Sequence, residues 1–225
     1  MTTTVQSVLK DVVATLKDPL GVRWPADELV SYFNSGELEV LLHRPDELNK
    51  FAPLVLVDGT RQKLPADGAK LIDIPRMTNG SVVRQVDRSI LDYMIPGWHT
   101  SKKSSVIQHY VYDERDITVF YVYPPANAGV SLDINYCAYP TPIPAPSGKT
   151  VATVTGNMNV PDKYAGAMRD YVLYRAFSKD GEYSDYSARA AAHFQSFATA
   201  LGIDLQATAA VSPKEGSPGE VGGIV

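Results

Sequence analysis

The sequence predicts an α+β protein: helices from the N- and C-terminal parts of the chain form a bundle, an antiparallel β-rich subdomain is inserted between them, and an extended C-terminal tail follows. Three observations predict this fold class. Apolar residues repeat at helical spacing before about residue 43 and after residue 161, short alternating runs broken by turn residues lie between, and the last twenty residues are rich in glycine and proline. A chain of 225 residues suits one ordinary domain, or a core with an inserted subdomain.

Two helices are predicted in the N-terminal part of the chain. The first spans about 4–17, with a threonine N-cap in front and Asp18-Pro19 behind. The second begins at Trp24-Pro25 and ends at about His43, before Arg44-Pro45. The first helix carries a single apolar stripe and must therefore pack against another element. The residues of that stripe are Val5, Val8, Leu9, Val12, Val13 and Leu16.

The middle of the chain is predicted to be β-rich. Asp58-Gly59 follows an apolar run and is typical of a hairpin turn. A short helix is expected over 88–94, and the turns 113–116 and 124–129 are expected to join strands of one antiparallel sheet. The predicted strands are 54–57, 62–64, 71–74, 82–86, 109–112, 117–123 and 130–139.

The C-terminal third is predicted to be a helical pair. Residues 140–150 contain four prolines and form a semi-rigid linker, and a short strand is expected over 151–154. Asn159 to Asp162 then cap a helix that ends at about Lys179, and a second helix from about Tyr183 to Leu201 is capped by Gly202. The predicted regions are the N-terminal helices over 1–50, the β-rich insertion with its linker over 51–160, the helical pair over 161–203 and the tail over 204–225.

The tail has too little apolar surface to order by itself. Residues 206–225 include four glycines, two prolines and no aromatic residue. Segments of this kind order when they bind a partner. We therefore expect the tail to dock on another protein, with Val221, Ile224 and Val225 as its anchors.

Composition excludes several classes of protein. The formal net charge of −4 does not favour a nucleic-acid binder. The single cysteine, Cys137, excludes an intrachain disulfide and a two-cysteine metal site. The N-terminus lacks the features of a signal peptide, and no apolar run approaches the roughly 20 residues that span a bilayer. We expect a protein that folds in a cytoplasm and has no membrane partner.

The sequence contains no recognisable catalytic, cofactor or metal motif. Ser147 to Thr150 resembles the end of a phosphate-binding loop, but Ile143 stands where that motif needs glycine, so a plain loop is predicted. No histidine pair has the spacing of a helical metal site. The histidines are His43, His99, His109 and His193. The acids Asp113, Glu114 and Asp116 near His109 are explained by a charged hairpin turn.

Tyrosines are concentrated in the predicted strands. Their rings and hydroxyls suit ordinary sheet packing and a protein interface equally well, and a carbohydrate-binding sheet is a third interpretation. These tyrosines are Tyr110, Tyr112, Tyr121, Tyr123, Tyr136 and Tyr139.

Several segments, taken in order, resemble the head–tail adaptor (connector, or head-completion) family of tailed bacteriophages. They are Trp24-Pro25 with Glu28-Leu29 and Tyr32-Phe33-Asn34, Arg44-Pro45-Asp46, Phe120 to Pro125, Val160 to Tyr164, Asp170 to Asp180, Glu182-Tyr183, and Ala190 to Phe197. The resemblance implies a structural virion protein of the phage neck. It implies a ring, usually of twelve copies, that binds the portal protein, meets a tail or nozzle protein and lets DNA pass without specific binding. In this family the C-terminal segment commonly reaches into the portal.

Two other classes remain open from the sequence. One is another virion component, such as a tail terminator or a sheet-based binding protein that uses the tyrosine-rich strands. The other is an enzyme, for example a cell-wall hydrolase, which would need Asp113, Glu114 or His109 for turnover.

Overall fold

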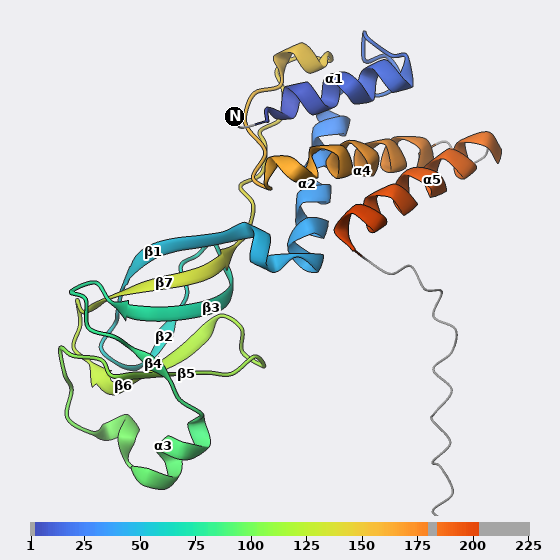
Figure 1. Cartoon of the computed structure of the whole chain (residues 1–225). Helices are drawn as coiled ribbons and strands as arrows, with labels where there is room; N and C mark the ends of the chain where they lie inside the picture. Colours follow the sequence, from blue (N-terminus) through green and yellow to red (C-terminus); the bar gives the residue numbers. More distant parts are fainter. Residues whose placement is uncertain (1–2, 180–183, 203–225) are drawn as a thin grey trace, which may run out of the picture.

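The computed structural model describes residues 3–179 and 184–202 and shows an α+β chain with helices gathered at one end and sheets at the other (Figure 1). The helical unit, as named here, consists of α1 (Val5–Leu16), α2 (Ala26–His43), α4 (Ala165–Ser178) and α5 (Ser184–Leu201). The β unit holds residues 49–138, including the short helix α3 (Arg88–Met94). The predicted fold class is α+β, and the described chain agrees. The predicted tail lies outside the described residues.

The first two helices follow their sequence signals closely. The Thr4 side chain accepts a hydrogen bond from Ser7 N at 3.2 Å, and Lys17 ends α1 in the left-handed conformation with φ 55°. At α2 the chain enters through Pro25, and Asp27 and Glu28 stand in the first turn, where the helix dipole favours acids. Both predicted helices are confirmed to within two residues.

The four long helices enclose one apolar core. Helix α4 packs against α1, α2 and α5, so segments from both parts of the chain meet around it (Figure 1). Gly36 permits the closest approach, because a Cβ at this position would lie only 2.8 Å from Tyr171 Cδ1. The largest fully buried side chains of this core include Leu9, Leu29, Phe33 and Phe197.

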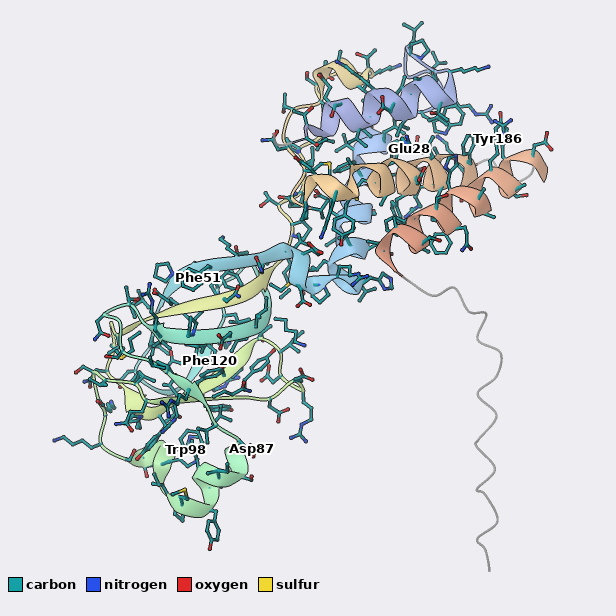
Figure 2. The ribbon with its side chains drawn as sticks, viewed as in Figure 1. Glu28, Phe51, Asp87, Trp98, Phe120 and Tyr186 are labelled. Atoms are coloured by element: carbon teal, nitrogen blue, oxygen red, sulfur yellow. The ribbon has the colours of Figure 1, made fainter. Side chains whose placement is uncertain are left out.

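The β unit is a sandwich of two sheets. The strands are β1 (Asn49–Val55), β2 (Gly59–Lys63), β3 (Gly68–Met77), β4 (Arg84–Gln85), β5 (His109–Tyr112), β6 (Val119–Ala126) and β7 (Ser131–Ala138). One sheet has the order β1-β7-β3 and the other β2-β6-β5-β4, with antiparallel pairing except between β4 and β5. Phe120, Ile134 and Tyr136 are buried between the sheets, and Figure 2 labels Phe120 there.

The predicted hairpin at Asp58-Gly59 is wrong. Strand β1 pairs with β7 and β2 pairs with β6, so this turn carries the chain from one sheet to the other. The corner is held by buried Gln62, whose Oε1 accepts from Val57 N and whose Nε2 donates to Val57 O, each at 2.8 Å. The side-chain amide replaces the cross-strand bonds that a hairpin would supply.

The prediction of one sheet for the last three strands is also wrong. Strands β5 and β6 pair across the turn 113–116 as expected, but β7 lies in the other sheet. Segment 127–130 is a second crossing between sheets. Alternation along a strand identifies a buried face but not the sheet that contains the strand.

The connection from β7 to α4 differs from its prediction in two details. Residues Val151–Thr153 form a 3-10 turn that contacts α1, so the predicted strand over 151–154 is wrong. Asp162 does not cap α4; its Oδ1 accepts from Thr3 N at 2.7 Å instead. Asn34 fixes the proline-rich segment at the backbone of Ile143. Its Oδ1 accepts from Ile143 N at 2.8 Å, and its Nδ2 donates to Ile143 O at 3.1 Å.

Candidate interaction surfaces

The histidines lie apart from one another in four different settings. His43 is 3.7 Å from Glu39, His99 bonds Thr60 Oγ1 at 2.9 Å, and His193 lies 3.1 Å from Asp170 Oδ1. His109 stacks on Tyr123 in the β unit. No group of three His, Cys, Asp or Glu side chains within the described ranges could hold a metal ion.

The acidic turn between β5 and β6 is a solvent-exposed ion-pair cluster. Asp113 binds Arg115 Nη2 at 2.7 Å, and this guanidinium lowers the pKa of Asp113 to about 2. Glu114 pairs with Lys70 at 3.3 Å across the strands. A carboxyl group held ionised by a neighbouring cation is poorly suited to donate a proton, so the arrangement favours the structural interpretation of this turn.

Residues 147–150 form a loop that packs onto the start of α2. Lys149 O accepts a hydrogen bond from Ala26 N at 2.9 Å. The backbone of Lys149 also fills the space beside Gly21, which adopts φ +63°. The loop prediction is confirmed, and the segment supports α2.

The strand tyrosines divide into packing residues and one exposed residue. Tyr110 and Tyr136 are buried in the sandwich, with their hydroxyls bonded to Asp73 at 3.0 Å and Asp67 at 3.1 Å, and burial raises the pKa of both phenols. Tyr112, Tyr121 and Tyr123 pack against the same unit. Tyr139 is half exposed, and it is the tyrosine of this group that suits an interface.

Exposed apolar side chains mark both ends of the molecule. At the helical end, Leu20 and Val22 protrude from a loop that the Asp18 carboxylate fixes by accepting from the backbone N–H groups of 22, 23 and 24. These bonds also lower the pKa of Asp18. At the other end, the α3 tip, as named here, exposes Ile90, Tyr93 and Met94.

The α3 tip is supported by a cluster of aromatic side chains around a buried tryptophan. Trp98 is almost fully buried beneath it, donates from Nε1 to Asp92 Oδ1 at 2.9 Å, and meets Tyr121 and Tyr123 edge to face (Figure 2). Tyr93 of the same helix is 88% exposed. A rigid support under an exposed apolar residue is a property of binding surfaces.

Strand β1 offers a third exposed surface. It lies at the edge of its sheet and exposes Phe51 and Val55 on its outer face (Figure 2). Edge strands with exposed apolar residues are ready to bind another chain.

The junction groove, as named here, lies where α2 ends against the β unit. It has a volume of about 510 Å³ and mostly apolar walls. Its exposed apolar residues come from three elements: α2, the β5–β6 turn and the end of β7. They are Leu38, Leu42, Ile117 and Tyr139. The rest of the wall is formed by Glu39, Leu41, Pro45, Ala69, Lys70 and Cys137, and burial raises the pKa of the Cys137 thiol.

The comparison with protein families supports the adaptor among the classes that the sequence leaves open. A model of the SU10 adaptor protein family matches residues 3–221, nearly the whole chain. The chain belongs to the SU10 adaptor protein family. This is a family of phage head–tail adaptors, so the protein is a structural adaptor of the virion that interacts with head and tail components.

A search of curated proteins finds no match to this adaptor. Among residues 3–179 and 184–202, no helix has the length and apolar character needed to cross a bilayer.

The C-terminal residues that were predicted to anchor the tail are not among the described residues. They are Val221, Ile224 and Val225. The junction groove, two of whose apolar residues are Leu38 and Leu42 of α2, was not predicted from the sequence. A helical projection separates these two from the buried stripe of Leu29, Phe33 and Val40, and that separation was the available signal.

Proposed function

We propose that this adaptor forms a ring between the capsid portal and the tail and continues the channel through which DNA passes. The ring belongs to the neck of the virion, is assembled in the host cytoplasm and contains twelve copies, as is usual in the family. A heterologous interface repeated by rotation closes such a ring. The sandwich and the helical unit serve as the body, and a tail or nozzle protein binds the opposite side from the portal.

The observation that best supports this proposal is the spread of exposed apolar residues over the molecule. An adaptor ring needs two faces for its ring neighbours and two more for the portal and tail. The described chain offers the Leu20 loop, the outer face of β1, the junction groove and the α3 tip. Exposed apolar residues that form a contiguous patch often mark a site of protein–protein contact.

The C-terminal tail is the proposed portal contact. Its anchors are Val221, Ile224 and Val225, the large apolar residues near its end. A segment that orders on its partner adds contact surface without a further folded domain.

The acidic balance of the chain suits the proposed channel. Attraction to phosphate groups supplies most of non-specific DNA binding, and a formal net charge of −4 keeps this attraction weak. A ring whose inner wall proved to be lined with lysine and arginine would contradict this part of the proposal.

Electron microscopy of the protein mixed with purified portal tests the function. We expect a ring on the tail-facing end of the portal. Bare portal beside a dispersed chain would overturn the proposal.

The tail is tested in the same assay. The triple variant V221S/I224S/V225S should fail to dock, whereas S212A/S217A, which leaves the anchors in place, should dock like the native chain. Deleting residues 206–225 should have the same effect as the triple variant. Normal docking of either anchor variant would show that another segment binds the portal.

The division of the chain at residues 50, 160 and 203 is part of the same proposal. Separate apolar cores in the helical unit and the β unit support it. Limited proteolysis should cut the tail first and leave residues 1–203 together, because the N- and C-terminal helices share one core.

A further inference from the structure

The chain leaves α5 at the edge of the junction groove. Arg44 Nε donates to Leu201 O at 2.7 Å, and a Cβ on Gly202 would lie 2.6 Å from Arg44 Nη2. Arg44 stands between Leu42 and Pro45, which both line the groove. Figure 1 shows the end of α5 beside the end of α2 that adjoins the β unit. Whatever follows Gly202 therefore starts next to this apolar surface.

Gly202 also ends the helix. Its φ of +67° is the left-handed conformation that terminates α5 and turns the chain away from the helix axis. Extended chain covers up to about 3.3–3.6 Å per residue, so a nine-residue segment has ample length for the groove.

The segment 203–211 has the pattern of an extended chain with one apolar face. Apolar residues stand at alternate positions and polar residues occupy most of the positions between them. The apolar set is Ile203, Leu205, Ala207, Ala209 and Val211, and the polar set is Asp204, Gln206 and Thr208. The proposed portal contact uses none of these residues.

The charges of Arg44 and Asp204 also favour a position of this segment beside the junction groove. Among the described residues no carboxylate lies within ion-pair distance of Arg44, although Glu47 is near enough for the charge of Arg44 to lower its pKa, and the guanidinium touches the end of α5. Asp204, two residues beyond Gly202, supplies a carboxylate within reach of it.

We propose that the junction groove binds residues 203–211 of its own chain, with Ile203 and Leu205 covering Leu38 and Leu42 and with Asp204 facing Arg44. This segment then clamps the helical unit to the β unit and fixes the point from which the distal residues 212–225 depart. The proposal concerns the isolated chain, so it stands or falls independently of portal binding.

Disulfide trapping in the full chain tests the proposal. The double variant L42C/L205C, oxidised at low protein concentration, should form an intramolecular disulfide several-fold faster than L42C/G219C. Peptide mapping separates this bond from any that involves buried Cys137. Equal rates for the two variants, or a bond only between copies, would overturn the proposal; the second result would mean that a neighbouring copy fills the groove.

A second pair of variants separates binding from mere closeness along the chain. Adding Ile203→Asn to L42C/L205C should slow trapping several-fold, because a polar side chain then faces the apolar wall. Adding Ser217→Asn, the matched control outside the segment, should leave the rate unchanged. If Ile203→Asn had no effect, residue 205 would be near the groove without binding it, and the proposal would fail.

Discussion

At the scale of single residues, Glu37 shows how one buried carboxyl group organises a long connection. Its Oε1 accepts from Asn159 N at 2.7 Å and its Oε2 from Asn159 Nδ2 at 2.6 Å. Asn159 in turn donates to Thr141 O at 2.9 Å. Glu37 therefore ties α2 to both ends of the segment that joins β7 to α4.

Removing this carboxyl group should destabilise the fold. We expect Glu37→Ala to lower the free energy of unfolding by about 1–3 kcal/mol, because it removes two hydrogen bonds between a fully buried carboxylate and Asn159. Urea unfolding measures the loss. Glu39→Ala, on an exposed part of the same helix, is the control and should change the value by less than about 0.5 kcal/mol. Equal losses would show that the Asn159 contacts contribute nothing.

The same residue should make stability depend on pH. Burial, the largest influence, raises the pKa of Glu37 above its ordinary 4.5 in the folded protein. The folded state then binds the proton more tightly than the unfolded state. Protonation of Glu37 therefore adds to the free energy of unfolding below pH 4.5, and this stabilisation is lost as pH rises through the folded pKa. The difference in unfolding free energy between the native chain and Glu37→Gln should shift over that range. A constant difference would contradict the assignment.

Residues of this kind were beyond the reach of the sequence. Glu37 lies on the buried stripe of α2 with Phe33 and Val40, and a charged residue in that stripe was a signal for a buried partner. The partner, Asn159, is separated by 122 residues, and no local pattern connects them. The prediction that Asp162 caps α4 was wrong for the same reason. Aspartate before a helix is typical of a cap, but the carboxylate of Asp162 accepts its hydrogen bond from the distant Thr3.

At the scale of elements, the crossing of α2 and α4 depends on a glycine. A Cβ on Gly36 would lie 2.8 Å from Tyr171 Cδ1 and 3.0 Å from Met168 Cε. We expect Gly36→Ala to destabilise the protein by about 1–3 kcal/mol through overpacking, which outweighs the gain of up to about 1 kcal/mol in helix propensity.

Gly166→Ala in α4 is the matched control for the crossing. A Cβ there meets no atom within 4 Å, so only helix propensity changes, and the variant should be neutral or slightly more stable. Thermal unfolding of both variants measures the difference. Stabilisation by Gly36→Ala would mean that the two helices can move apart at no cost.

Helices were predicted well and strand pairing poorly, for a physical reason. The signals of α1 and α2 lie within the helices and their caps, as with Thr4 and Pro25. Strand partners are chosen over long separations: β1 pairs with β7, and Asn49 faces Cys137. The turn at Asp58-Gly59 has hairpin residues, yet the buried amide of Gln62 makes it a corner between sheets. A helical projection could have marked Leu38 and Leu42 as a separate apolar face, but the other walls of the junction groove could not be predicted, since they form only when α2 meets β3 and β7.

At the scale of the whole molecule, the positions of the exposed apolar surfaces suggest a direction for the adaptor. The described chain ends at Gly202 in the helical unit, and the α3 tip lies at the far end of the β unit (Figure 1). If the C-terminal tail, which leaves α5 beside the junction groove, binds the portal, the α3 tip lies at the end of the molecule away from that contact. The α3 tip then faces the tail component.

This direction predicts a separation of two binding activities. The double variant Y93S/M94S should keep its unfolding temperature and its ring on the portal, because Tyr93 and Met94 are 88% and 70% exposed and support no core. It should, however, lose binding to the purified tail or nozzle protein at least tenfold, since exposed aromatic residues often dominate an interface. Co-sedimentation of preformed portal–adaptor complexes with the tail component measures the loss, and substitution of the exposed Lys102 by serine (Lys102→Ser) is the control. Loss of the ring with tail binding intact would place α3 at the opposite end of the assembly and reverse the direction argued from Gly202.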